Sequence, residues 1–568
     1  MKRRDFLIRV AAAGGSTYAA MRALDLIANP AKAQTGPVRL TRPKERRRVI
    51  IIGAGVAGLT AAYELGKVGY DTVILEARNR PGGRCWTLRD GDSFEEIAVA
   101  ATGSAGAGTT PNQIITANFS RGQYFNPGPA RIPQHHVTLD YCRELGVALE
   151  VFSNLNRQQY YFNEAGATIS ISGNNAPVGG RLAGKKIRVR AALADTRGYL
   201  SELLAKAVDK GALDQELSGV DKERLLEFLR TYGALGTRET GFAYTGGSRR
   251  GWSNFDVDTN VETGEAPGAV GRRGNSGKPY TLADLLALRF ANYEAFESGS
   301  EQQMLMYEPV GGIDAIVQGF IRQPSVGPRV RYNAEVTEIR KTSSGVRVVT
   351  TQGTFEGDYC ICTIPLSVLR LLANAGKTDF SAAMVSAIDQ VGRNYAVTGK
   401  AAFETNRRFW EEDEDIYGGI TNCSFNTSVP GANFIPQLST IWYPSSGFGS
   451  DRGVLVGYYN FGVNAANFGL LRDSDRIRIA VAQAAKIHPQ LNQTFVSGVS
   501  VYWPAVKYSL GGWSSSGIDT YPASVVSTLS SRDGNIWLAG EHMSNLTGWL
   551  AGAIESAKLV VQQINQLG

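Results

Sequence analysis

The clearest chemical signal in the chain is a run of glycines spaced to hold the phosphates of a dinucleotide. The run is Gly53-Ala54-Gly55-Val56-Ala57-Gly58, a G-x-G-x-x-G pattern. Its first glycine permits a tight turn, its second lets the backbone approach a pyrophosphate, and its third lets a helix pack closely on a strand. Further along, Glu76 has a carboxylate that can accept hydrogen bonds from ribose hydroxyls. These residues predict a dinucleotide site.

The elements that must position these residues are readable on both sides of the glycines. Residues 49–52 are a run of Val and Ile, typical of a buried parallel strand. Residues 59–68 have helical periodicity, and residues 71–75 predict a second strand that ends at Glu76. A lone G-x-G-x-x-G is a weak signal, but strand, glycines, helix, strand and acid in this order favour a nucleotide-binding β-α-β unit over a purely structural one.

Motifs downstream of this unit indicate which dinucleotide is bound. Arg78-Asn79-Arg80-Pro81-Gly82-Gly83-Arg84-Cys85-Trp86-Thr87 contains a G-G-R-x-x-T pattern, which by itself could equally be an ordinary Pro-Gly-Gly turn. Later segments are Val310-Gly311-Gly312-Ile313-Asp314, Thr363-Ile364-Pro365-Leu366, Ala539-Gly540-Glu541 and the helix start at Gly548-Trp549-Leu550. Together, from about residue 49 to the C-terminus, the chain resembles the flavin amine oxidases, and within them the L-amino-acid oxidase branch.

The resemblance implies that FAD is the cofactor. It is expected to be non-covalent, because Trp513 stands where monoamine oxidases have the cysteine that bonds the flavin. The final helix is expected to point its N-terminus at the flavin. The residues expected to contact FAD are Gly53, Gly55, Ala57, Gly58, Glu76, Ala77, Arg78, Gly83, Arg84, Pro129, Ala130, Arg131, Val336, Glu541, Gly548, Trp549 and Leu550.

Three residues carry the expected substrate chemistry. Arg131, in a segment similar to the family's G-x-M-R-x-P with Ala130 in place of Met, is expected to pair with a substrate carboxylate. Tyr443 matches a family tyrosine that supplies a hydroxyl to the same carboxylate. Lys400, followed by Arg408-Phe409-Trp410-Glu411, matches the lysine that holds a water near flavin N5. Gly548, Trp549 and Trp513 are expected to line the substrate site.

Each of these residues also has an ordinary structural interpretation. Arg131 could be a surface arginine in a Pro-rich turn, Tyr443 an aromatic core residue, and Lys400 a surface lysine. Trp513 and Trp549 could simply pack in the core. The predictions therefore depend on whether folding brings these residues to one site.

The resemblance implies the oxidative deamination of L-amino acids to 2-oxo acids, with release of ammonia and hydrogen peroxide. Dioxygen would be the second substrate. Two rival activities stay open at this point. One is the oxidation of amines that lack a carboxylate, and the other is a dehydrogenase that passes electrons to an acceptor other than oxygen.

The predicted fold class is α/β, with a discontinuous Rossmann-type FAD-binding domain, a mixed sheet and helix substrate domain, and a helical insertion domain. Segments 46–110, 305–375 and 525–568 carry the FAD motifs. Segments 111–150 and 376–524 are assigned to the substrate domain. Segment 151–304 is assigned to the helical domain, because residues 200–208 and 225–232 have helical periodicity.

The N-terminus has the features of an export signal. Lys2-Arg3-Arg4-Asp5-Phe6-Leu7 is a twin-arginine start, and Ala31-Lys32-Ala33 resembles a cleavage site. The sequence therefore predicts a signal peptide over residues 1–33, recognition by the twin-arginine machinery, and a periplasmic or secreted protein. A disordered basic tail is the alternative. Most of the net charge of +7 lies in this leader, so the rest is only weakly basic and nucleic-acid binding is not expected.

Composition limits the remaining options. No stretch of about 18 uncharged apolar residues occurs, which argues against a membrane span. The five cysteines are too sparse for a disulfide scaffold, and the four histidines have no H-x-x-x-H spacing, so no catalytic metal is expected. The sequence does not decide between a monomer, a homodimer and a higher homo-oligomer.

Overall fold

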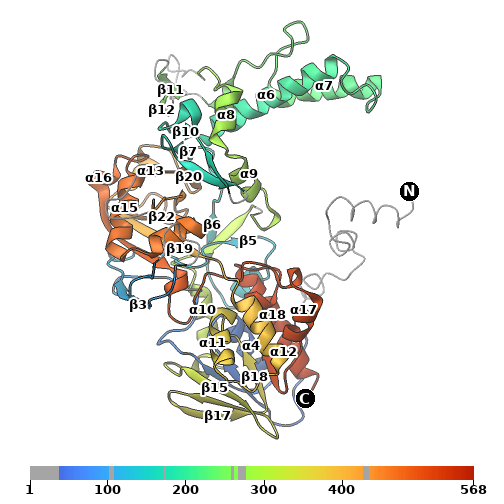
Figure 1. Cartoon of the computed structure of the whole chain (residues 1–568), viewed down its shortest axis with the longest axis vertical. Helices are drawn as coiled ribbons and strands as arrows, with labels where there is room; N and C mark the ends of the chain where they lie inside the picture. The colour runs from blue at the N-terminus through green and yellow to red at the C-terminus, as the bar shows by residue number, and fades with distance from the viewer. Residues whose placement is uncertain are drawn as a thin grey trace.

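The computed structural model of the chain describes residues 38–101, 108–171, 174–251, 253–256, 261–265, 277–302, 304–426 and 434–567. The predicted signal peptide therefore lies outside the described residues. The molecule is elongated, with a lower body that contains α4, α18 and β18, an upper body that contains β19, β22 and α15, and a pair of helices projecting from the top (Figure 1). Within the described residues, no helix is long and apolar enough to cross a membrane.

The lower body is built on a five-stranded parallel sheet. Its strands, in spatial order, are β14 (Val330–Arg331), β2 (Asp71–Leu75), β1 (Arg48–Ile52), β18 (Tyr359–Cys362) and β24 (Ile536–Leu538). These strands come from three segments far apart in the chain, and the two strands predicted around the glycine run are confirmed.

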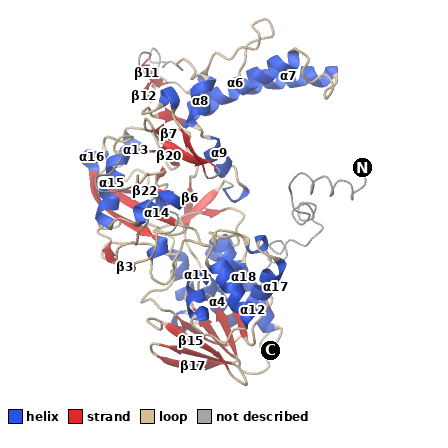
Figure 2. Cartoon of the chain, viewed as in Figure 1, coloured by secondary structure: helices blue, strands red, loops and turns tan. Residues whose placement is uncertain are grey.

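Both faces of this sheet are buried, which explains the continuous apolar runs. Along β1, Val49 and Ile51 pack in one cluster with helices α4 (Val56–Lys67) and α18 (Leu550–Asn565). The alternate residues Ile50 and Ile52 pack in the other, with α11 (Leu366–Asn374) and α12 (Ala382–Gly392). Figure 2 shows α4, α11, α12 and α18 grouped together in the lower body.

The upper body is built on a seven-stranded mixed sheet. In spatial order its strands are β10 (Ile187–Arg188), β7 (Tyr160–Asn163), β20 (Ile420–Ser424), β21 (Thr440–Trp442), β22 (Gly453–Phe461), β19 (Thr398–Thr405) and β23 (Phe495–Tyr502). Helix α15 (Asp473–Ala484) packs against β22 and β23. This mixture of sheet and helix agrees with the composition predicted for the substrate domain.

The segment assigned to a helical domain contains both helices and strands. The predicted helices are present within α6 (Val189–Asp209) and α7 (Gly219–Gly233), which form the projecting pair in Figure 1. However, β7 and β10 of the same segment lie at the edge of the seven-stranded sheet, where β7 pairs in parallel with β20. Strands of four and two residues are too short to give a periodic signal, so the sequence did not reveal them.

The remaining elements connect and cover the two bodies. The further strands are β3 (Ser93–Glu96), β4 (Gln113–Thr116), β5 (Ile132–Pro133), β6 (Leu149–Phe152), β8 (Thr168–Ile171), β9 (Asn174–Pro177), β11 (Ser253–Asp256), β12 (Val261–Glu265), β13 (Met306–Pro309), β15 (Val336–Lys341), β16 (Val346–Thr350) and β17 (Gly353–Gly357). The further α-helices are α5 (Thr138–Glu144), α8 (Leu282–Leu288), α9 (Ala291–Glu297), α10 (Ala315–Ile321), α13 (Phe409–Glu412), α14 (Gly462–Gly469), α16 (Leu491–Thr494) and α17 (Ala523–Ser530).

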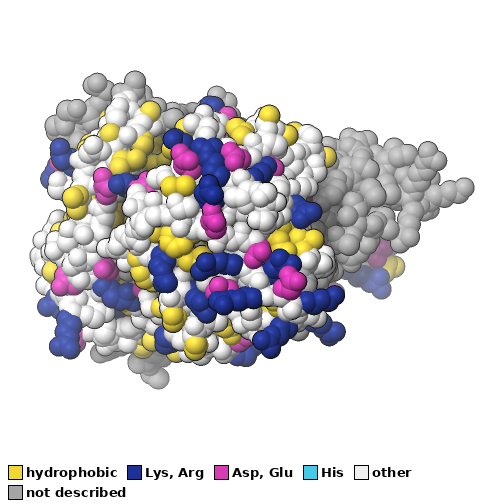
Figure 3. Space-filling view, turned by 90° about the horizontal axis from the view of Figure 1, so that it is seen from below, with side chains coloured by type: hydrophobic (Ala, Val, Ile, Leu, Met, Phe, Trp, Pro, Cys, Tyr) yellow, Lys and Arg dark blue, Asp and Glu magenta, His cyan; other side chains and the backbone are white. Residues whose placement is uncertain are grey.

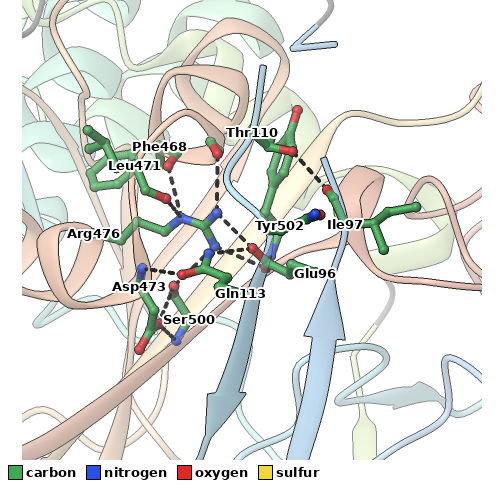
Figure 4. A network of polar contacts seen from close by, with 12 residues as sticks. Glu96, Ile97, Thr110, Gln113, Phe468, Leu471, Asp473, Arg476, Ser500 and Tyr502 are labelled. Carbon is green, nitrogen blue, oxygen red and sulfur yellow. Dashed lines mark hydrogen bonds and ion pairs between the residues drawn. The ribbon is translucent and has the colours of Figure 1, made fainter. Parts of the chain in front are cut away.

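A buried ion pair fastens the β3–β4 hairpin to the upper body (Figure 4). Glu96 and Arg476 are both fully buried, and two nitrogens of the guanidinium donate to the two carboxylate oxygens at 2.8 and 3.0 Å. The remaining bonding capacity is used by the backbone N–H of Tyr502 and the side chain of Gln113. Such a pair is specific to one arrangement of the elements, because either charge left alone would be costly.

The surface of the protein seen from below carries charges of both signs. On this face, basic side chains lie among acidic and apolar ones (Figure 3). The charges are interspersed there, as on an ordinary soluble surface.

Candidate functional site

A cavity of about 400 Å³ lies at the carboxyl ends of β1 and β2 and at the N-termini of α4 and α18. The carboxyl ends of parallel strands are where ligands bind in α/β folds. Most of the residues predicted to contact the cofactor line this cavity. They are Gly53, Gly55, Ala57, Glu76, Ala77, Arg78, Gly83, Arg84, Pro129, Val336, Glu541, Gly548, Trp549 and Leu550, together with Trp513.

The glycine loop has the geometry that its spacing predicts. Gly53 has a φ of 99°, which favours glycine. A Cβ on Gly58 would lie 2.0 Å from the carbonyl oxygen of Gly53, so Gly58 is needed for packing below the loop and does not line the cavity. A Cβ on Gly55 would meet nothing within 4 Å, because Gly55 faces the open cavity. The loop therefore leaves room for a ligand to approach the backbone at Gly55.

Two helix N-termini at the cavity are uncapped. Gly55 precedes α4 and Trp549 precedes α18, and in neither helix does a side chain cap the first turn or an acidic residue occupy it. Free N–H groups and the positive end of the helix dipole attract anions. The cavity can thus stabilise phosphate charge at one helix and negative charge on a bound ring at the other.

Glu76 and Arg84 hold the cavity wall in place. The two oxygens of Glu76 accept hydrogen bonds from the backbone N–H groups of Ala54 (2.8 Å) and Arg78 (2.9 Å). Arg84 donates to Glu541 and to the carbonyl of Gly512, both at 2.8 Å. Burial acts to lower the pKa of Arg84, but the charge of Glu541, the neighbouring Tyr395 and the hydrogen bond to Glu541 together outweigh burial, and the pKa is raised. Contact of either side chain with FAD stays a prediction.

Arg131 lies between two tryptophans but is not among the residues that line the cavity, and it forms no ion pair within the described part of the chain. Its guanidinium carbon is 4.5 Å from the ring centre of Trp442 and 5.5 Å from that of Trp549. One nitrogen donates to the neutral amide of Gln302 at 2.8 Å, while Nε is buried without a partner. Burial lowers the pKa of Arg131 to about 10, so the group stays cationic at neutral pH. The arginine is thus a half-buried cation with unused donors, which excludes the interpretation as an ordinary surface arginine.

Lys400 is buried in β19 close to the cavity. Its Nζ donates to the carbonyl oxygens of Gly128 (2.5 Å) and Asn126 (3.3 Å). Burial, together with the charge of Arg131, lowers the pKa of Lys400 to about 7. Gly128 lines the cavity described above, so Lys400 contacts the wall of that cavity. Lys400 itself lines a second, neighbouring cavity, which Ala130 also lines. Lys400 is therefore not the surface lysine of the structural interpretation.

The structure does not bring the Tyr443 hydroxyl to Arg131. This hydroxyl is fully buried and forms hydrogen bonds of 2.7 Å with both Thr421 and His488. Trp442, the last residue of β21, packs beside Arg131, whereas the next residue, Tyr443, packs in a different apolar cluster. The interpretation of Tyr443 as a core aromatic residue is the one that the structure supports.

Tyr459 is the tyrosine that folding places near Arg131, and sequence reasoning missed it. It lies opposite Lys400 on β22, lines the cavity, and has its ring centre 4.5 Å from the Lys400 Nζ. Burial raises the pKa of Tyr459 to about 12, although the charge of Arg131 opposes this. The cross-strand position opposite Lys400 could have identified it only once the strand register was known.

A second group that the sequence did not reveal supports the Arg131 side. His136 lies edge-on to the Trp549 ring at 5.1 Å and forms a 2.7 Å hydrogen bond with Glu301. The next residue, Gln302, is the partner of Arg131. The side-chain atoms of His135, His136 and Glu301 that could bind a metal ion lie within 4.8 Å of one another. Spacing in the sequence does not show this grouping, because Glu301 is far along the chain from the two histidines. Glu301 of this cluster directly precedes Gln302, so the cluster lies next to the hydrogen-bond partner of Arg131.

Comparison with known proteins places this geometry in a family. The family described as "Flavin containing amine oxidoreductase" matches residues 56–565. A putative L-amino-acid oxidase, YobN, of Bacillus subtilis is 24% identical, covering 93% of this chain and 96% of the relative. The flavin-dependent L-tryptophan oxidase RebO of Lentzea aerocolonigenes is 26% identical, covering 91% and 98%. The L-amino-acid oxidase of Gloydius blomhoffii is 25% identical, covering 96% and 92%.

A solved structure shows the same fold. Putrescine oxidase bound to putrescine superposes with a TM-score of 0.51 at 16% identity, covering 92% of this chain and 99% of that one. Since the family match runs from Val56, inside the glycine run, to residue 565 in the final helix, it spans most of the chain and the resemblance seen in the sequence is confirmed. The chain belongs to the family of flavin-containing amine oxidoreductases.

Proposed function

We propose that this protein is an FAD-dependent L-amino-acid oxidase. The net reaction converts an L-amino acid, dioxygen and water into a 2-oxo acid, ammonia and hydrogen peroxide. The observation that carries the proposal is Arg131, a half-buried cation between two tryptophans that has no acidic partner among the described residues. Relatives described as L-amino-acid oxidases over nearly the whole chain support the same substrate class.

The residues present fit FAD. The open space at Gly55 and the uncapped start of α4 suit a pyrophosphate, and the uncapped start of α18 suits a ring that gains negative charge. FAD, when bound, supplies the chemistry of accepting two electrons and passing them to dioxygen. Non-covalent attachment is part of the proposal, because Trp513 lines the cavity at the position compared with a flavin-bonding cysteine. Cys85 also lines it, but burial raises its pKa and its thiol points to the carbonyl of Ile313.

The Arg131 guanidinium is suited to a carboxylate because of its charge. A guanidinium offers two parallel N–H groups to a carboxylate, and such bonds are strongest where water is excluded. The nearby Glu297 does not neutralise Arg131 at neutral pH, since burial and then the charge of Glu294 raise the pKa of Glu297 to about 8. A substrate carboxylate would therefore supply a negative charge opposite Arg131.

Lys400 and Tyr459 complete the proposed site. With a pKa of about 7, Lys400 can hold or release a proton at Nζ near neutral pH, and the carbonyls of Gly128 and Asn126 fix that atom. Tyr459 presents a protonated hydroxyl and an aromatic face beside it. We assign to Tyr459 the role of hydroxyl donor that the resemblance implied for Tyr443.

The test is the visible spectrum of the flavin-loaded protein under anaerobic conditions. L-amino acids, D-amino acids and simple amines are added one at a time, and bleaching of the flavin band is followed. Bleaching by L-amino acids alone supports the proposal. Bleaching by simple amines and not by amino acids would replace it with an amine oxidase activity. Dye reduction without peroxide in air would identify a dehydrogenase that uses another acceptor.

We also propose that the chain is exported by the twin-arginine pathway. The support is the Arg3-Arg4 pair in the leader, which lies outside the described residues. Replacing both arginines by lysine should leave the flavoprotein in the cytoplasmic fraction, while the unaltered chain is found outside it. Equal export of both chains would contradict the proposal.

A further inference from the structure

The second cavity of the upper body, about 310 Å³, contains two carboxylates that the proposed reaction does not use. They belong to Glu308 of β13 and Glu150 of β6. These strands pair antiparallel, and the two glutamates lie directly opposite each other in the register. Directly opposite side chains on one face of a sheet have Cβ atoms about 5 Å apart, so two like charges there are destabilising.

No cationic side chain offsets this repulsion. Among the described residues, neither glutamate takes part in an ion pair, and Oε1 of Glu308 is buried without a hydrogen-bond partner. Glu308 is 4% exposed. Burial, and then the charge of Glu150, raises the pKa of Glu308 to about 8, and burial alone raises that of Glu150. At neutral pH a carboxyl group with this pKa is mainly protonated, and a bound cation would favour its ionised form.

The basic residues that line the same cavity are directed to other acceptors. Arg408 donates to Glu411 at 2.7 Å and to the carbonyl of Ser446 at 3.0 Å. Arg452 donates to the Ser120 hydroxyl at 3.2 Å and lies 3.7 Å from Glu404. Lys400, as described above, is bound by two backbone carbonyls. The two glutamates are therefore the carboxyl groups of the cavity that have no ion-pair partner among the described residues.

The rest of the wall has the composition that accepts an organic cation. Phe152 and Trp442 pack in one apolar cluster beside the glutamates, since Phe152 lies two residues after Glu150 on the same face of β6. Tyr124 and Phe125 also line the cavity. Aromatic faces attract ammonium groups, and their edges accommodate an alkyl chain.

We infer that this cavity binds an alkylammonium group, with Glu308 and Glu150 as its carboxylate partners and Phe152 and Trp442 as its apolar walls. The same chemistry has two sources. The group is either the side-chain ammonium of a basic amino-acid substrate or a separate small amine. The first source rests on the proposed function, whereas the second does not.

The first experiment measures binding of tert-butylammonium to the flavin-loaded protein by calorimetry. This probe has no hydrogen on the carbon that bears nitrogen, so it cannot be oxidised there. We expect saturable binding that weakens about tenfold or more in Glu308→Gln, because a charge-assisted hydrogen bond is lost. Glu150→Gln should weaken binding in the same direction, and Glu227→Gln, an equal charge change on the exposed face of α7, should not.

The second experiment distinguishes the sources by comparing L-lysine with L-norleucine, which has the same carbon chain without the terminal ammonium. If the substrate side chain enters the cavity, kcat/KM should favour L-lysine by about tenfold or more, and Glu308→Gln should abolish the preference while L-norleucine oxidation is unchanged. If a separate amine is the ligand, the two substrates react alike but tert-butylammonium still binds through Glu308.

The inference is overturned if wild type and both glutamine variants bind tert-butylammonium equally, or not at all, and show the same ratio of L-lysine to L-norleucine turnover. In that case the two carboxylates share a proton and have a structural role. Failure of the proposed function has a different signature: no L-amino acid would bleach the flavin, while the binding of tert-butylammonium and its dependence on Glu308 would persist.

Discussion

Replacing Arg131 by leucine isolates the contact on which substrate class depends. Leucine keeps an apolar side chain between Trp442 and Trp549 but removes the guanidinium. Loss of one partner of a buried, hydrogen-bonded charge pair costs about 2–5 kcal/mol. Because Arg131 is only half-buried, we take the lower part of that range, about 2–4 kcal/mol. This corresponds to a decrease in kcat/KM of roughly 30-fold to 1,000-fold.

The assay compares a substrate with its decarboxylated counterpart. L-norleucine and n-pentylamine differ only in the carboxylate, so the loss in Arg131→Leu should appear with L-norleucine and be absent with n-pentylamine. Arg131→Lys retains the charge without the bidentate geometry and should fall between wild type and Arg131→Leu. The flavin spectrum and the thermal midpoint serve as controls for folding. If Arg131→Leu oxidises L-norleucine within about threefold of wild type, the carboxylate role of Arg131 is refuted.

Three further predictions concern the cofactor loop, a buried lysine and a buried ion pair. Gly55→Ala should leave the stability of the apoprotein within about 1 kcal/mol, because the new methyl group meets nothing, but should raise the Kd for FAD at least about tenfold, measured by fluorescence titration. The pKa of Lys400 is about 7 in the folded protein and 10.5 for an unperturbed lysine, as in the unfolded chain. Between these pH values the unfolded chain binds more protons at Lys400 than the folded protein does, so the contribution of Lys400 to the free energy of unfolding rises with pH. The thermal midpoint of wild type relative to Lys400→Met should therefore increase from pH 7 to pH 10, with a full effect of at most about 5 kcal/mol, and a pH-independent difference would contradict the burial argument. Glu96→Leu should lower the free energy of unfolding, measured by urea denaturation, by about 3–5 kcal/mol, because it leaves the buried charge of Arg476 without its partner. The double variant Glu96→Leu with Arg476→Met should lose less free energy of unfolding than the sum of the two single variants.

The parts of the fold that the sequence predicts are those encoded over short distances. The unit β1–α4–β2 depends on an apolar strand, a glycine loop and an amphipathic helix within about thirty consecutive residues. The start of α18 and the long helices α6 and α7 are equally local. Consequently β1, α4 and β2 agree with the prediction made from spacing, and the start of α18 at the same cavity agrees with what the family resemblance implied.

The parts that the sequence does not predict depend on strand pairing between distant segments. Whether Trp442 or Tyr443 faces the site is set by one residue of register in β21, and a shift of one residue exchanges the two faces. The position of Tyr459 depends on its pairing with Lys400, and that of Gln302 on a contact with Arg131 across 171 residues of chain. No local sequence pattern contains these pairings. The motifs therefore identified the segments of the site, but the residue of each segment that faces the site is known only from the fold.

Unsatisfied buried charge gives information that motifs do not. Arg131 is a cation, Glu308 is a carboxyl group that a bound cation would ionise, and each has a buried polar atom without a hydrogen-bond partner among the described residues. If stability alone had shaped this region, the two groups would be paired or replaced by apolar groups of similar size, since a buried ionisable group without a partner is costly. Trp442 lies against Arg131 and also lines the cavity of Glu308, so both groups border one side chain. A basic L-amino acid carries a carboxylate and a distant ammonium group, and it would offer a partner to both groups at once.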